Sequence, residues 1–199
     1  MATKTDLANF ALGHIGDVVI TDVDSPTNEA GRTVNLWFDT ARRRVLRLAN
    51  WNCCAKRVEL AADATAPVYG YNFRYLLPGD FIRFVKMNYS GAGLEAAIES
   101  GYVLTNKSSP IFIKYVFDEL DVSKFDEDLV QAVAFMLAYY ISPKLTQSNT
   151  KRTELREAAY DEVTRAKDVD TSGQAPQLIA GGSWVRGFSG QRDPTKWWG

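Results

Sequence analysis

The chain has 199 residues, of which 46% are hydrophobic and 24% are charged, and its formal net charge at pH 7 is −1. This composition is typical of a globular protein with its own hydrophobic core, and the balanced charge argues against nucleic-acid binding through an overall basic excess. Charged and polar residues interrupt residues 1–17, which excludes a signal peptide or a membrane span there. We therefore expect synthesis in the cytoplasm and no membrane partner.

Two helices are predicted before residue 50. Thr3 and Asp6 form a weak capping box at the start of a helix from about 4 to 15. Ser25 as the N-cap and Pro26 at the first helical position predict a second helix from about 26 to 49, in which apolar residues recur at steps of three and four.

Residues 55–118 change to the alternating pattern of strands. The stretch VYGYNFRYL predicts a strand with one aromatic face, made by Tyr69, Tyr71, Phe73 and Tyr75. Three further runs, FIRFVKMN, GYVLTN and IFIKYVF, are separated by turn residues, so we expect an antiparallel meander of short strands. An exposed aromatic ladder promotes aggregation, so these rings should face the interior or a partner.

The helical period returns after this β segment. The run DEDLVQAVAFMLAYYI is apolar around most of its circumference, which predicts a buried third helix that Pro143 ends or kinks. A fourth helix from about 149 to 168 carries a narrow apolar stripe and an i,i+4 pair of Asp161 and Arg165. The predicted fold class is α+β: a four-helix bundle of two plus two helices (1–54 and 119–170), an inserted β meander (55–118) and an extended C-terminal arm (171–199).

The predicted arm is rich in aromatic residues although glycine and proline prevent it from packing on itself. Its aromatic side chains are Trp184, Phe188, Trp197 and Trp198. A chain end with this much Gly, Ser and Pro also fits a disordered terminus, but disordered tails are poor in aromatics. We expect a docking arm whose aromatic side chains enter pockets of a partner.

Two charge clusters exceed what the helix dipoles need. The basic cluster at the end of the second helix contains Arg42, Arg43, Arg44 and Arg47. The acidic cluster between residues 118 and 128 includes Asp118, Asp121, Asp126 and Glu127. Because a cyclic assembly places different surfaces of one chain together, we expect the arginines of one subunit to meet the acidic stretch of its neighbour.

No catalytic signature is found in the sequence. His14, the single histidine, has no serine or cysteine nucleophile nearby in sequence, and the adjacent Cys53 and Cys54 are expected to be reduced. The stretch DVDSPTNEAGRT lacks the glycine and the glutamate of a calcium loop. We expect no catalytic residue, metal or cofactor. Two other classes stay open: a DNA-binding module using Arg42 to Arg47, and an enzyme with dispersed residues such as Asp126 and Glu127.

Three stretches carry a resemblance to a known family: LANFALGHIGD, DSPTNEAGRTVNLWFDTARRRVLRLANWNCCAKRVELA and PVYGYNFRYLLPGDFIRFVKM. The most specific features are the Arg-rich helix end followed by Trp51-Asn52 and Lys56-Arg57, and the run from Gly70-Tyr71 to Pro78-Gly79-Asp80. In these features, roughly residues 5 to 165 resemble the tail tubular protein A, or head-to-tail adaptor, family of short-tailed bacteriophages.

The resemblance implies a structural protein of the virion tail, assembled in the host bacterial cytoplasm. A homododecameric ring would join the portal protein of the DNA-filled head to the tail nozzle protein, with tail fibres as a further partner. Genome DNA would pass through its lumen without sequence-specific binding. The arm would dock on the portal or on a neighbouring subunit, and the aromatic face of residues 69–75 would meet the nozzle or the interior. A head-completion or stopper protein is the alternative connector role.

Overall fold

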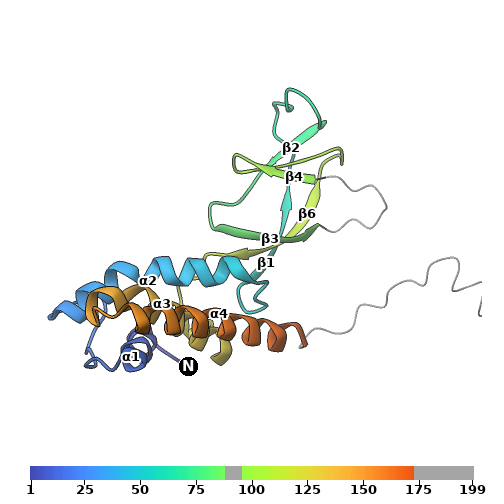
Figure 1. Cartoon of the computed structure of the whole chain (residues 1–199). Coiled ribbons are helices and arrows are strands. Elements are labelled where there is room, and N and C mark those ends of the chain that lie inside the picture. Colours follow the sequence, from blue (N-terminus) through green and yellow to red (C-terminus); the bar gives the residue numbers. More distant parts are fainter. Residues whose placement is uncertain (88–95, 173–199) are drawn as a thin grey trace, which may run out of the picture.

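The computed structural model describes residues 1–87 and 96–172, which form a mixed α+β structure (Figure 1). The helices are α1 (Lys4–Ile15), α2 (Glu29–Leu48), α3 (Glu127–Leu145) and α4 (Asn149–Ser172), with a short 3-10 helix η1 (Val122–Lys124). The strands are β1 (Ala55–Leu60), β2 (Phe73–Leu76), β3 (Phe81–Met87), β4 (Ala96–Glu99), β5 (Tyr102–Thr105) and β6 (Ile111–Phe117). We call α1–α4 the helical layer and β1–β6 the β module.

Helix α1 begins and ends as its sequence predicts. The Thr3 hydroxyl accepts a hydrogen bond from the Asp6 N–H, and the Asp6 carboxylate accepts one from the Thr3 N–H at 2.9 Å, which confirms the capping box. The helix is closed by Gly16, whose φ of 75° lies in the left-handed region that glycine adopts at no steric cost.

Helix α2 begins later than the sequence suggests, and the prediction of Ser25 as its N-cap is wrong. The N-cap is Asn28, whose Oδ1 accepts a hydrogen bond from the Gly31 N–H at 2.7 Å. A Cβ on Gly31 would lie 3.0 Å from both Asn28 Oδ1 and Pro26 Cβ, so glycine permits the close approach of the preceding turn. Asparagine caps a helix as well as serine does, and here Asn28 rather than Ser25 satisfies the first-turn donor.

Helix α3 is the centre of the helical layer and packs against α1, α2 and α4. Pro143 does not end it, because the helix continues to Leu145. Proline has no N–H for the carbonyl of Tyr139, and the hydroxyl of Ser142 donates to that carbonyl at 3.0 Å instead. The local sequence therefore compensates for the bond that proline removes.

Helix α4 covers α3 with the apolar stripe that the sequence predicts, and it is longer than expected. Its described buried side chains include Leu155, Ala159, Val163 and Ala166. The predicted pair of Asp161 and Arg165 is wrong, because Arg165 pairs with the nearly buried Glu162, three residues before it in the helix.

The strands form two small antiparallel sheets instead of one meander, in the orders β1-β6-β3 and β2-β5-β4. Strand β3 pairs with β6 through two irregularities, and the residues skipped in the register are Ile82 and Val85. Both skipped residues pack against the helical core, while Phe84 of the same strand packs into the core of the β module. The two bulges thus allow one strand to serve two cores.

The predicted aromatic strand at residues 68–76 is largely wrong. Only Phe73–Leu76 is a strand, and the segment before it turns at Gly70, where φ is 84°. Tyr75 is fully buried and its hydroxyl donates to the Lys107 carbonyl at 2.7 Å, whereas Tyr69 is 88% exposed. Tyr71 and Phe73 are half-buried. A left-handed glycine breaks the alternation that the aromatic spacing suggests.

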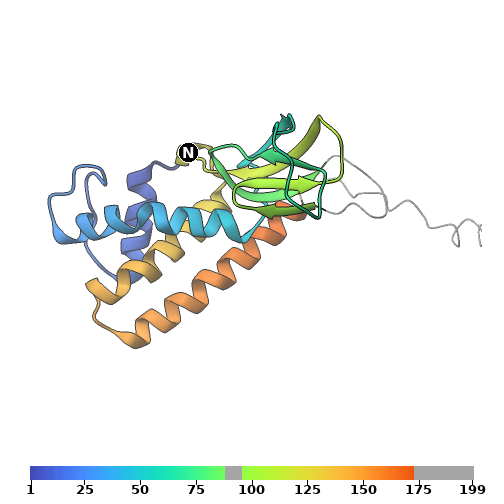
Figure 2. The same ribbon diagram turned by 90° about the horizontal axis from the view of Figure 1, so that it is seen from above.

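The β module projects from one end of the helical layer (Figures 1 and 2). One core lies among the helices and includes Val116 of β6, and a second lies between the two sheets around Tyr75, Ile111 and Ile113. Phe117 packs against both cores. In addition, the Arg83 guanidinium donates to the carbonyl of Arg47 at 2.9 Å, which ties β3 to the end of α2.

Candidate functional site

Arg42 is buried within the fold and does not lie on the surface. Its side chain is 1% exposed, and Nη1 donates to Asp118 Oδ1 and to the Glu119 carbonyl, each at 2.5 Å. Asp39 accepts from Nη2 at 3.2 Å, and Arg43 pairs with the second oxygen of Asp118 at 2.8 Å. Arg42 and Asp118 therefore satisfy each other within one subunit, and their assignment to a contact with a neighbouring subunit is corrected.

The other two arginines of the cluster remain at the surface. Arg44 donates from Nη2 to the hydroxyl of Tyr160 at 3.1 Å, which links α2 to α4, and this hydrogen bond raises the pKa of the Arg44 guanidinium. Arg47 is exposed. These two side chains stay available for a partner, so the predicted interface is smaller than the sequence suggests.

Most of the acidic cluster serves local structure. Asp121 caps η1 by accepting from the Ser123 N–H at 3.1 Å, and bonds from the Ser123 hydroxyl and N–H lower the pKa of Asp121. Asp126 caps α3 by accepting from the Leu129 N–H at 2.8 Å. The nearly buried Glu119 accepts from Lys124 at 3.0 Å. Glu127 is exposed in the first turn of α3.

The predicted docking residues lie outside the described residues. These are Trp184, Phe188, Trp197 and Trp198. The described part of the chain ends with α4, near the β module (Figure 2).

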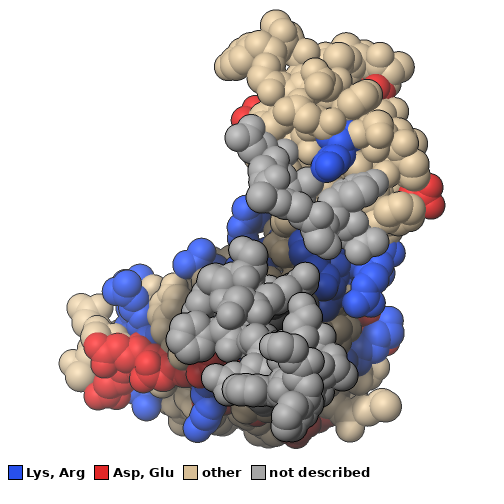
Figure 3. Space-filling view, turned by 90° about the vertical axis from the view of Figure 1, so that its right-hand side faces the viewer, with Lys and Arg blue, Asp and Glu red and all other residues tan. Residues whose placement is uncertain are grey.

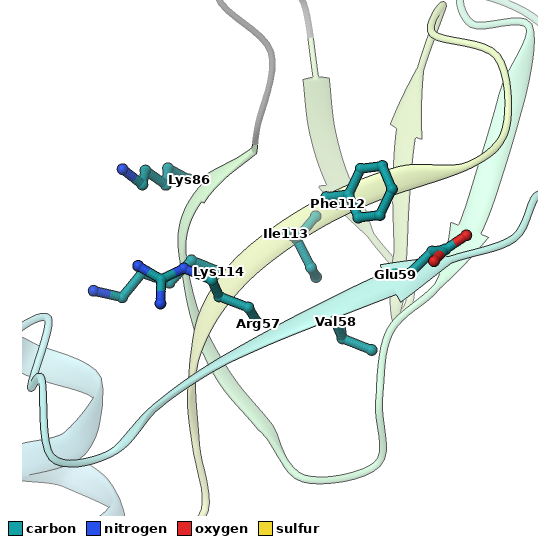
Figure 4. Close-up of a pocket in the computed structure, with 7 residues that line it drawn as sticks. All are labelled: Arg57, Val58, Glu59, Lys86, Phe112, Ile113 and Lys114. Carbon is teal, nitrogen blue, oxygen red and sulfur yellow. The ribbon is translucent and has the colours of Figure 1, made fainter.

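A row of three cations, not expected from the sequence, crosses the outer face of the sheet β1-β6-β3. Lys114 of β6 is the register partner of both Arg57 of β1 and Lys86 of β3. Their side chains extend in the same direction from the three strands (Figure 4). Neighbouring strands are about 4.8 Å apart, so the three charges span about 10 Å. We call these three residues the basic row.

The basic row borders an open depression of about 440 Å³. The remaining lining residues are Val58, Glu59, Phe112 and Ile113. Phe112 and Glu59 lie on the side of the depression away from the cations (Figure 4), and the ring of Phe112 is 41% exposed. Lys and Arg side chains gather where the β module meets the helical layer, on the side on which α4 ends (Figure 3).

The basic row is connected to the end of α4 through Asn52. Lys114 Nζ donates to Asn52 Oδ1 at 3.3 Å, and the Asn52 backbone N–H donates to Asp170 Oδ1 at 3.0 Å. Burial lowers the pKa of Lys114, and the neighbouring charges of Arg57 and Lys86 lower it further, against a smaller opposing effect of Asp170. Burial also raises the pKa of Asp170.

Sequence reasoning missed the basic row for a specific reason. Lys114 is the one charged residue in the apolar run IFIKYVF, and this interruption is a usable signal. Its partners depend on which strands pair, and the bulges in β3 decide that Lys86 lies opposite Lys114. Neither the strand order nor the position of the bulges can be seen in the local sequence.

His14, Cys53 and Cys54 are packed against other side chains of the helical layer and its border. The His14 ring stacks on Phe135 with ring centroids 3.9 Å apart, and burial lowers the pKa of His14. Cys53 and Cys54 are free thiols with their sulfur atoms 3.7 Å apart. The Cys53 thiol and burial together raise the pKa of Cys54.

Among residues 1–87 and 96–172, no group of three or more His, Cys, Asp or Glu side chains is arranged to hold a metal ion. Within the same residues, no helix is both long enough and apolar enough to cross a membrane. No family model matches the chain, and no curated protein matches its sequence significantly.

Proposed function

We propose that this protein is a head-to-tail adaptor of a short-tailed bacteriophage. In this role it is a structural subunit and not an enzyme. Its homododecameric ring joins the portal to the tail nozzle and forms part of the DNA ejection channel. The four helices form the bundle of each subunit, and the residues that follow α4 act as its docking arm.

The observation that carries the proposal is a set of large apolar side chains exposed on both the helical layer and the β module. Val19 in the α1–α2 connection is 73% exposed, and Leu36 in α2 is 72% exposed. At the far tip of the β module, in the loop before β2, Val68 is 100% and Tyr69 is 88% exposed (Figure 1). A subunit that contacts one partner above and another below needs an apolar surface at each end.

These side chains are large enough to contribute to assembly. Burial of a Val, Leu or Tyr-sized side chain stabilises a contact by about 1.5–3 kcal/mol, and a ring repeats each contact once for every subunit. Single exposed apolar residues are common on monomers, whereas a contiguous apolar patch marks an interaction surface, so the neighbouring Val68 and Tyr69 are the stronger of the two candidates.

The structure gives evidence against the DNA-binding module as an alternative function and does not bear on the head-completion or stopper role. In a DNA-binding module using Arg42 to Arg47, Arg42 could not contact DNA, because it is buried and paired with Asp118. A head-completion or stopper protein would use the same two ends, so it stays the second candidate connector role. Arg44, Arg47 and Glu127 remain candidates for the contact between subunits.

Electron microscopy of the full-length protein, alone and mixed with the portal protein, tests the proposal. We expect rings that dock on the portal. The double variant Val19→Asp with Leu36→Asp should abolish portal docking, because it places charge in the helical end contact. The double variant Val68→Asp with Tyr69→Asp should retain portal docking and lose the nozzle protein.

The matched control is Thr40→Asp, which adds a charge at an exposed position of α2 without removing an apolar side chain. It should dock like the unmodified protein. A protein that stays monomeric with the portal present, or that assembles normally with both double variants, would contradict the proposed role.

A further inference from the structure

The basic row carries an electrostatic cost within the fold that the described carboxylates offset only in part. Like charges directly opposite each other on adjacent strands destabilise a sheet, and Lys114 faces one on each side. Arg57, Lys86 and Lys114 make no ion pair with any residue in 1–87 or 96–172. Asp170 is the acidic group that acts on Lys114, but its carboxylate already accepts hydrogen bonds from Asn52.

Two other cations of the β module are paired with carboxylates of the chain itself. Lys56 pairs with Asp80 at 2.8 Å, and Arg74 pairs with Asp63 at 3.1 Å. The contrast indicates that the basic row is complementary to an anion from outside the chain.

The shape and chemistry of the row favour nucleic acid over a protein carboxylate. Arg57 and Lys86 are exposed and Lys114 is half-buried. The row therefore presents about 10 Å of accessible positive charge on the face of the sheet, which an elongated polyanion can reach. Duplex DNA carries one negative charge per about 1.7 Å of its axis, and it therefore presents about six charges over this length. An α-helix of the same length contains about seven residues, so it would match this charge density only if nearly every residue were acidic.

We infer that the basic row binds the phosphate backbone of duplex DNA without reading its sequence. Two of the three cations are lysines, which act as compact point charges and suit phosphate oxygens. The inference does not depend on the proposed function, because it concerns the isolated chain.

The test is fluorescence anisotropy of a short labelled duplex titrated with the full-length protein. Three phosphate contacts give a salt slope of about −2.7, so raising salt from about 50 to about 200 mM should weaken binding about 40-fold. The triple variant Arg57→Gln, Lys86→Gln and Lys114→Gln should weaken binding at low salt at least about tenfold and remove most of the slope. Changing the duplex sequence should have no effect.

Matched variants separate the row from general charge. Arg32→Gln, Lys144→Gln and Arg156→Gln remove the same charge from exposed positions at the opposite end of the helical layer, and they should keep the slope. The variant Lys86→Arg with Lys114→Arg keeps the charge and should bind like the unmodified protein. If the triple variant does not fold, Lys86→Gln alone, at an exposed strand position, should still reduce the slope by about 0.9.

Three results would overturn the inference. The first is no duplex binding at low salt, and the second is an equal loss in the two triple variants. The third is binding of poly-glutamate that depends on the row without duplex binding that depends on it, since this would assign the row to an acidic protein surface. None of these results would affect ring formation, which electron microscopy measures separately.

Discussion

Arg42 and Arg43 are neighbours in the sequence and share the carboxylate of Asp118, yet they differ in their surroundings. Arg42 is 1% exposed and also donates to the Glu119 carbonyl, whereas the side chain of Arg43 is 58% exposed. Removal of one partner from a buried ion pair leaves a desolvated charge, while an exposed pair contributes little. The same residue type at adjacent positions therefore has two different roles.

We expect Arg42→Ala to lower the free energy of unfolding by about 3 kcal/mol, and Arg43→Ala by less than about 1 kcal/mol. Urea unfolding followed by circular dichroism measures both variants under the same conditions. If Arg42→Ala kept the stability of the unmodified protein but prevented ring formation, Arg42 would be an interface residue after all.

Among the elements, α2 shows how local chemistry chooses between competing start signals. Ser25-Pro26 and Asn28 both resemble helix starts, and the structure uses Asn28 because Gly31 lets the cap approach closely. Ser25 is exposed and lies outside the helix.

Asn28→Ala should therefore destabilise the protein by about 1 kcal/mol, the usual cost of losing an N-cap side chain. Ser25→Ala is the matched control and should change the stability by only a few tenths of that value. Thermal unfolding of the two variants compares them directly, and equal losses would mean that Ser25 contributes to the helix start in solution.

The predictable part of the fold is the part with local causes. The capping box of α1 and the buried stripe of α4 follow from spacing and side-chain chemistry within one helix. The sheet order does not, because β1 pairs with β6, and Ala55 lies opposite Val116. For the same reason the partner of Arg42 and the basic row could not be predicted. Each depends on contacts between residues far apart in the chain.

At the scale of the whole molecule, the two described cores are complete before the end of α4. The last core residue is Ala166, and α4 continues to Ser172. The predicted docking arm follows in sequence, with its first large aromatic residue at Trp184. Folding and docking should therefore be separable by truncation.

Truncation before Gly181 should leave the helix content and the unfolding temperature nearly unchanged while portal binding is lost and filled heads leak DNA. The reason is that four large aromatic side chains, each worth about 1.5–3 kcal/mol when buried, are removed from the partner contact. Circular dichroism measures the helix content and unfolding temperature, co-sedimentation measures portal binding, and nuclease digestion of the released DNA measures leakage from filled heads. Alanine at Trp184, Phe188, Trp197 and Trp198 in the full-length chain is the control for length. A truncated protein that docks and retains the genome normally would show that the segment is a dispensable end.

The two bulges of β3 also constrain how this protein can change through evolution. Ile82 and Val85 pack against the helical core, and Phe84 and Met87 pack in the core of the β module. Deletion of one residue from this strand would move Lys86 out of line with Lys114 and shift an apolar residue out of its core. We therefore expect the helical layer and the β module to be inherited together, since a recombination event that exchanged either one alone would have to preserve both bulges.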